Sequence, residues 1–170
     1  MVSPFPDHPV PMKPIATLTF RLLLCLAIAA PAMAKDTLPT GWVEIGGKRF
    51  TVELALDDAS REKGLMHRRS MPANNGMLFV HDYTGWLGYW MKNTLLPLDI
   101  LYFDEQRQLV TQQRDVPPCR STGNDCPVHP SYAPARYVLE LNAGTARQLG
   151  LKNGDRLTLG PGIPTIGAGH

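Results

Sequence analysis

The chain has 170 residues, with 17 basic residues against 15 acidic ones and a formal net charge of +2. A chain this close to neutral, without a basic stripe, is not typical of nucleic-acid-binding proteins, so nucleic acid is not an expected partner. The length predicts a single domain after an N-terminal targeting segment.

Residues 12–34 have the layout of a secretory signal peptide. A basic start is followed by an apolar run over Leu22–Ala30 and by an Ala-x-Ala cleavage pattern that ends at Ala34. The run is roughly half of the ~20 apolar residues that a transmembrane helix requires, so we expect no membrane insertion once the signal is cleaved. We predict that translation begins at Met12, that residues 1–11 are not translated, and that the mature protein is periplasmic or secreted.

The beginning of the mature chain predicts a β-hairpin after a loose leader over residues 35–41. Trp42–Ile45 and Arg49–Leu56 flank the pair Gly46-Gly47, which is a two-residue turn signal. In the second run, apolar and polar residues alternate, which is typical of a strand with one buried face. We therefore expect one hairpin here.

A short helix is predicted over Ala59–Lys63. Asp57 or Asp58 can cap its N-terminus, because a carboxylate accepts hydrogen bonds from the first free backbone N–H groups. Gly64 follows the last helical residue and ends the helix, since glycine adopts the backbone conformation of a C-terminal cap. Residues 65–75 are predicted to be a loop.

Beyond residue 75 the sequence predicts short strands separated by turns, with a second helix over Gly144–Leu149. The strongest strand is Pro97–Phe103, which is largely apolar and of strand length. The tail over residues 160–170 is rich in Gly and Pro and is predicted to be disordered. The remaining predicted strands span Gly76–Val80, Gly85–Thr94, Gln108–Arg114, Tyr137–Leu141 and Arg156–Leu159.

These elements predict a mainly β fold, which is a single small β-barrel or β-sandwich domain with two short helices. Strands do not alternate with long helices along the chain. A parallel sheet built from βαβ units is therefore disfavoured.

The mature chain has two cysteines, Cys119 and Cys126, in a predicted loop over Asp115–Pro134. An even number of cysteines in an oxidising compartment predicts a disulfide. Together with His129 they have a spacing that is weak for zinc, and methionines in apolar strands usually fill gaps in the core rather than bind copper. We expect no metal, and no motif predicts a cofactor.

One predicted strand combines aromatic and charged residues. Trp90 and Lys92 fall on the same face of it, and a lysine is rarely buried without a partner. Lys92 either extends to solvent past Trp90, or supplies the charge of a cleft whose floor is Trp90. Asn93 belongs to the same segment and is a further candidate ligand-binding residue.

Asp99 and Arg61 complete the set of candidate binding residues. Asp99 shares a strand face with apolar residues, so its carboxylate needs a donor, either Lys92, Arg61 or a backbone N–H. The Pro97 region can turn the chain so that the strands carrying Lys92 and Asp99 lie side by side, with these two residues facing each other. Arg61 either holds a loop in place or binds an anion.

Several short motifs follow one another along the chain, namely Arg61-x-x-Gly64-Leu65-Met66-x-Arg68, Gly76-Met77-Leu78-Phe79, Trp90-Met91-Lys92-Asn93-Thr94-x-x-Pro97-Leu98-Asp99-Ile100, Pro118-Cys119, Cys126 with Tyr132, Leu139-Glu140-Leu141-Asn142-Ala143-Gly144 and Gly154-Asp155. In this order and spacing they resemble the domain-of-unknown-function family 192 (DUF192), with a domain over residues 42–159. The resemblance implies a small, mainly β fold, often in exported bacterial or archaeal proteins. It implies no activity.

Three functions are compatible with these residues. The leading hypothesis is a periplasmic binding or accessory module that holds a small polar or anionic ligand, or a partner peptide, near Arg61, Trp90 and Lys92. The second is an enzyme that uses Lys92 with Asp99 or Glu140 as an acid–base pair. The third is a structural protein of the cell envelope. The expected partner is a small molecule or an envelope protein, and a pocket that holds Lys92 would favour the first two functions.

Overall fold

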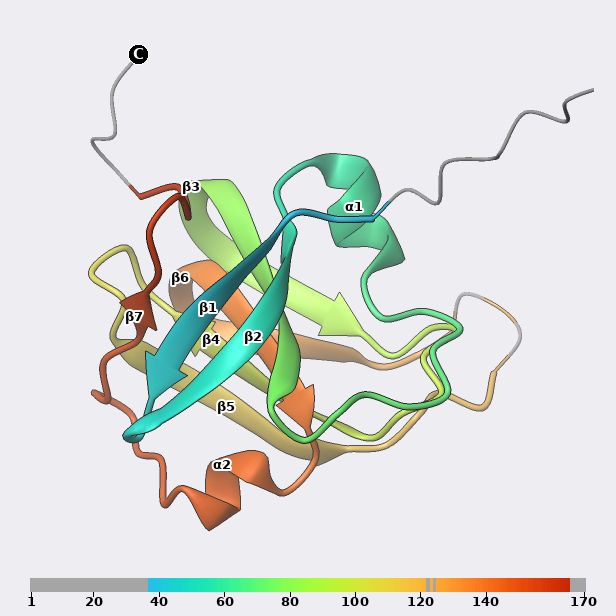
Figure 1. Ribbon diagram of the computed structural model, residues 1–170. Coiled ribbons are helices and arrows are strands. Elements are labelled where there is room, and N and C mark those ends of the chain that lie inside the picture. Colours follow the sequence, from blue (N-terminus) through green and yellow to red (C-terminus); the bar gives the residue numbers. More distant parts are fainter. Residues whose placement is uncertain (1–36, 122, 124, 166–170) are drawn as a thin grey trace, which may run out of the picture. The chain divides into compact units, whose positions relative to one another are not determined.

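The computed structural model describes residues 37–121, 123 and 125–165 (Figure 1). They belong to the second of two compact units, Asp36–His170, and the predicted signal peptide lies outside them. Within these residues, no helix has the length and the hydropathy that crossing a membrane requires.

Seven strands and two short helices make up the described residues: β1 (Thr40–Ile45), β2 (Lys48–Ala55), α1 (Asp58–Lys63), β3 (Asn75–Trp90), β4 (Leu98–Phe103), β5 (Leu109–Val116), β6 (Val128–Asn142), α2 (Thr145–Gln148) and β7 (Thr158–Leu159). The strands form one curled half-barrel sheet in the order β5-β4-β6-β3-β2-β1-β7. The two helices lie at opposite ends of this sheet (Figure 1). The mainly β prediction with two short helices is confirmed.

β1 and β2 form the predicted hairpin. Ile45 pairs with Lys48 across Gly46 and Gly47, whose φ angles of 58° and 74° lie in the left-handed region. A two-residue turn with two positive φ angles matches the twist of the flanking strands, and glycine adopts it without a steric penalty. β1 begins at Thr40, so regular structure starts inside the segment that was predicted to be a loose leader.

α1 has the predicted caps and connects two neighbouring strands. The Ser60 N–H donates to Asp57 Oδ1 at 2.7 Å, and the Asp57 N–H donates to Ser60 Oγ at 3.2 Å, which is a capping box. Gly64 ends the helix with a φ of 44°. The chain passes from β2 through α1 to β3, and β2 and β3 are parallel. The other pairs of described strands are antiparallel. The sheet of these described strands therefore contains one parallel pair, although a parallel sheet was disfavoured by the sequence.

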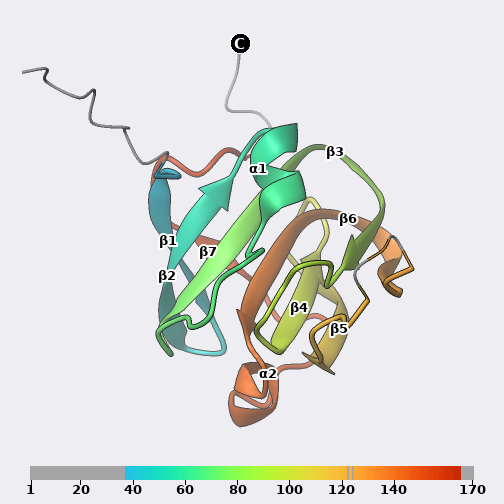
Figure 2. The same ribbon diagram turned by 90° about the vertical axis from the view of Figure 1, so that its right-hand side faces the viewer.

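β3 and β6 are longer than predicted and bend together (Figure 2). β3 runs from Asn75 to Trp90 where two strands were predicted. β6 begins at Val128, inside the predicted cysteine loop, because the second half of β3 provides a partner for it. The chain leaves β3 at Trp90, so Lys92 is not on a strand, and the predicted strand face shared by Trp90 and Lys92 is wrong.

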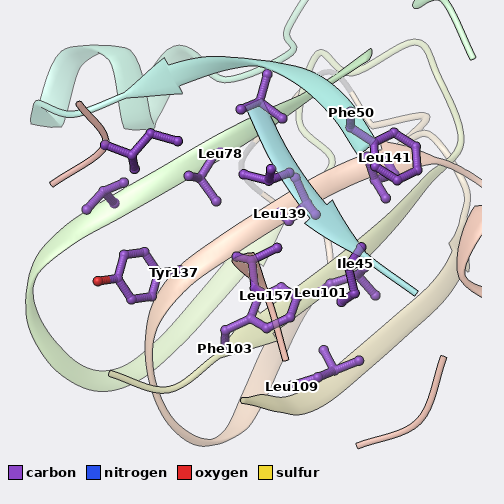
Figure 3. Close-up of a cluster of buried hydrophobic side chains, with 14 of the residues drawn as sticks. Ile45, Phe50, Leu78, Leu101, Phe103, Leu109, Tyr137, Leu139, Leu141 and Leu157 are labelled. Carbon is purple, nitrogen blue, oxygen red and sulfur yellow. The ribbon is translucent and has the colours of Figure 1, made fainter. Parts of the chain in front are cut away.

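The two faces of the sheet carry separate hydrophobic clusters. The first lies inside the curl and includes Phe50 and Tyr137 (Figure 3). The second lies on the opposite face and includes Phe79. Because side chains alternate along a strand, neighbours on β6 point to opposite faces. Leu139 thus belongs to the first cluster, and Glu140 points toward the second.

The beginning of the C-terminal tail is packed, so its predicted disorder is wrong as far as Ile163. Ile163 is 6% exposed and belongs to the first cluster, and the Gly160 N–H donates to the Trp42 carbonyl at 2.8 Å. A Cβ at position 160 would lie 2.8 Å from Trp42, so glycine allows the tail to approach. The Gly- and Pro-rich composition of the tail predicted disorder because it does not show that Ile163 packs into the core.

Cys119 and Cys126 form the predicted disulfide, with their Cα atoms 5.8 Å apart. The Cys119 N–H donates to the Met91 carbonyl at 3.4 Å, so the bridge connects its loop to the turn after β3. We expect the double variant C119S/C126S to lose about 2.5 kcal/mol of unfolding free energy, because the open loop gains entropy in the unfolded chain. Urea unfolding of the variant and of the oxidised wild type measures this loss, and equal midpoints would contradict it.

Candidate functional site

A groove runs along α1, between the helix and the end of β3. It consists of three hollows that share Glu62 and Trp90 in their linings. Two are open, with volumes of about 340 and 220 Å³, and the third has a volume of about 30 Å³, which is the size of one water molecule. We call this the α1 groove, and the residues that line at least two of its hollows are Arg61, Glu62, Lys63, Met66, Tyr89 and Trp90.

Glu140 lines the smallest hollow. It pairs with Met77 of β3 and Ile100 of β4 in the middle of the sheet, and it is 5% exposed. Among the described residues, the carboxyl group of Glu140 has no hydrogen-bond donor. Burial raises its pKa to about 8, because the charged form is poorly solvated there. At pH 7 Glu140 is therefore mainly a neutral carboxylic acid that can donate a hydrogen bond into the hollow.

Aromatic residues beside Glu140 form an uncharged wall. The Tyr89 ring makes an edge contact with Phe79 at a centroid distance of 5.0 Å, and its hydroxyl lies 3.0 Å from Nε2 of His81. Burial raises the pKa of Tyr89 well above its usual value. Burial, and secondly the charge of Arg61, lowers the pKa of His81 to about 4. Both side chains are therefore neutral at pH 7.

The turn after β3 provides the other rim of the α1 groove. Asn93 has a φ of 54°, its carbonyl accepts a hydrogen bond from the His67 N–H at 2.8 Å, and its amide nitrogen lies 3.8 Å from Sδ of Met66. Lys92 Nζ lies 5.0 Å from the centroid of the Trp90 ring. The structure thus brings Trp90, Lys92 and Asn93 together in the lining of one hollow.

Arg61 also lines the α1 groove, but its guanidinium is engaged by the protein. Nη1 donates to the Leu56 carbonyl at 2.9 Å and to the Val80 carbonyl at 2.7 Å. Nη2 pairs with Asp58 at 2.7 Å and with Asp82 at 3.4 Å. Of the two predicted roles, this geometry matches the structural one, because Arg61 joins the end of β2 to the middle of β3.

Asp99 lies elsewhere, on the face of the sheet opposite Glu140. It is fully buried, and Oδ1 accepts from the Asp115 N–H at 2.8 Å and from the Gly144 N–H at 3.2 Å. Oδ2 accepts from the Ala146 N–H at 2.7 Å, so this carboxylate anchors the start of α2. β6 separates β3 from β4, so the predicted side-by-side arrangement of Lys92 and Asp99 is wrong. The backbone alternative is what the structure shows.

A fourth hollow, of about 300 Å³, lies against α1 and is lined by the ion pair of Arg68 with Glu53. Nη1 and Nη2 of Arg68 donate to the two carboxylate oxygens of Glu53, and these hydrogen bonds lower the pKa of Glu53. The two half-buried charges in this lining are therefore already compensated within the protein. This feature separates the hollow from the α1 groove, where Glu140 has no such partner among the described residues.

Sequence reasoning identified part of this site. Glu140 was named only as an alternative acid–base residue, and the hydrogen-bonded pair of Tyr89 and His81 was missed. A signal for Glu140 existed, because it is the one carboxylate in the apolar run Tyr137–Leu141. No local signal marks Tyr89 and His81 as partners, because a bend in β3 lies between them.

The comparisons with known proteins concern both the family and the fold. A family model, DUF192, described as Uncharacterized ACR, matches residues 41–159. A Sinorhizobium meliloti protein, provisionally described as a transcription regulator, has 39% identity and a TM-score of 0.67, over 74% of this chain and 98% of that one. A Novosphingobium aromaticivorans protein of unknown function has 32% identity and a TM-score of 0.66, and the match covers 76% of this chain and 93% of that one. A comparison with curated proteins gives no match. The chain belongs to the family DUF192.

Proposed function

We propose that the protein is an exported binding module that holds a small polar or anionic molecule in the α1 groove. The observation that carries this proposal is the carboxyl group of Glu140 under the groove, which has no hydrogen-bond donor among the residues that the structure describes. A buried polar group without a hydrogen bond destabilises a fold. A ligand that forms a hydrogen bond with Glu140 would offset this cost and explain why the carboxyl group lies there.

The two carboxyl groups buried in the middle of the sheet differ in a way that supports this proposal. Asp99 accepts three backbone hydrogen bonds and has a complete structural role. Glu140 is nearly as buried, lines a hollow, and accepts none from the described residues. A purely structural carboxyl group would be expected to resemble Asp99.

The enzyme hypothesis receives less support from the same geometry. Asp99 lies on the other face of the sheet and is occupied by backbone N–H groups, so it is not available as an acid–base partner for Lys92. Glu140 remains the one carboxyl group of the predicted pairs that faces the α1 groove. Binding is therefore the function that we propose.

Ligand binding can be tested with two tryptophan variants. Trp90 lines all three hollows, whereas Trp86 is 73% exposed and lines none of them, although both belong to β3. We expect native mass spectrometry of the mature protein against a panel of small carboxylates, phosphates, amines and sugars to identify a bound molecule. Trp90→Ala should weaken its binding at least tenfold, and Trp86→Ala less than twofold. A panel without a binder, or equal losses in both variants, would contradict the proposal.

Export is the second part of the proposal and rests on residues 12–34 of the sequence. We expect N-terminal sequencing of the protein from a bacterial periplasmic fraction to begin at Lys35. Replacing the alanines at positions 32 and 34 with arginine should leave the precursor uncleaved, because signal cleavage needs small residues there. An uncleaved wild-type chain in the cytoplasm would contradict export.

A further inference from the structure

We infer that the α1 groove binds small organic carboxylates, and that Glu140 donates a hydrogen bond to one oxygen of the bound carboxylate. This inference rests on the proposed function and adds the chemical class of the ligand. It comes from the size of the hollow, from the environment of Glu140 and from the charges around the groove.

The hollow above Glu140 limits the group that can enter it. Its volume of about 30 Å³ admits one water-sized group, so a carboxylate oxygen fits, whereas a ring or a whole phosphate does not. The neighbouring hollows, of about 340 and 220 Å³, are large enough for the rest of a small metabolite. Trp90 lines all three and provides a surface for the apolar part of the ligand.

An ammonium group is the main alternative occupant of the hollow, and two observations disfavour it. With a pKa of about 8, Glu140 is protonated at pH 7. A cation that pairs with it would first have to displace this proton, which lowers the affinity for the cation about tenfold. In addition, the charged side chains that line this hollow with Glu140 are Arg61 and Lys63 against Glu62. The two carboxylates that pair with Arg61, Asp58 and Asp82, are largely exposed and lie outside this lining. The excess of positive charge in the lining attracts an anion and repels an amine.

A neutral carboxylic acid and a carboxylate form a short, charge-assisted O–H···O hydrogen bond. Glu140 provides the proton, and the basic side chains of the groove attract the ligand's charge. Binding should therefore weaken as Glu140 loses its proton. The charged or titratable groups that line the hollow with Glu140, or act on it from packed elements, are Arg61, Glu62 and Lys63 of α1, Tyr89 of β3 and Tyr102 of β4.

Two substitutions separate the donor role of Glu140 from its shape. Glu140→Gln keeps the size of the side chain and a donor N–H that does not titrate. Glu140→Leu removes the donor and places an apolar side chain in an apolar environment. All the groups named above remain in both variants, so their titration is common to all three proteins. Circular dichroism of each variant establishes that it is folded before binding is measured.

The experiment is an NMR titration of the mature protein with propionate, propionamide and propylammonium at pH 7 and pH 9. We expect propionate to bind most tightly, with its affinity about tenfold lower at pH 9 in the wild type and changed less than twofold in Glu140→Gln. Glu140→Leu should lose at least tenfold at pH 7. The inference is overturned by tighter binding of propylammonium, by equal binding of propionate to Glu140→Leu, or by no binding of propionate. The proposed function survives these results if another molecule of the panel binds at Trp90, and fails with the inference if none does.

Discussion

Glu140→Gln will be more stable than the wild type at pH 8, and the difference will shrink as the pH falls. The pKa of Glu140 rises from 4.5 to about 8 in the folded protein, so between these values the folded state binds a proton that the unfolded state has released. Protein stability then falls with increasing pH by about 1.4 kcal/mol per pH unit. The contribution of Glu140 to stability is fully present below pH 4.5 and is lost by about pH 8. The total loss over this pH range is roughly 5 kcal/mol.

The expected measurement is the free energy of unfolding in urea at pH 5, 6.5 and 8, for the wild type, Glu140→Gln and the exposed control Glu62→Gln. His81 acts in the opposite direction, because its lowered pKa of about 4 removes stability as the pH falls below 6.5. It is present in all three proteins, so the difference between wild type and Glu140→Gln isolates Glu140. Parallel pH profiles for these two proteins would show that Glu140 is not a neutral acid at pH 7.

Asp99→Ala should destabilise the protein by about 3–5 kcal/mol, because it leaves three backbone N–H groups without their acceptor, and each unsatisfied buried donor costs about 1–3 kcal/mol. Lys92→Ala should lose less than about 1 kcal/mol, because Lys92 is partly exposed at the rim of the groove and its contact with Trp90 is of the cation–π type. The two residues belong to one sequence motif but to different parts of the fold.

Urea unfolding at pH 7 measures both changes under the same conditions. Asp99→Asn is a useful third variant, because it keeps one acceptor oxygen and should lose less than Asp99→Ala. A loss of several kilocalories per mole in Lys92→Ala would show that Lys92 is a determinant of the fold and would remove it from the groove hypothesis. A loss below about 1 kcal/mol in Asp99→Ala would contradict the anchoring of α2.

The sequence by itself determined the features that depend on residues a few positions apart. Gly46 and Gly47 predict the hairpin because two-residue turns between antiparallel strands favour positive φ angles, which glycine adopts without a steric penalty. Asp57 and Gly64 predict the ends of α1 because a cap acts on the backbone of its own helix. The apolar run from Leu98 to Phe103 predicts a strand, and all six of its residues are buried. Together with the family motifs, these signals gave the correct fold class.

Only the tertiary structure decided which residues form the candidate site. Asp99 and Ala146 are 47 positions apart, and no local pattern indicates that this carboxylate is satisfied by the backbone of α2. Glu140 is the reverse case, because its neighbours in sequence do not show that a hollow lies above it. The placement of β6 between β3 and β4 separates Asp99 from Lys92 and puts Glu140 under the groove. Such long-range pairings are determined by the packing of the whole sheet, which the local periodicity of each strand does not specify.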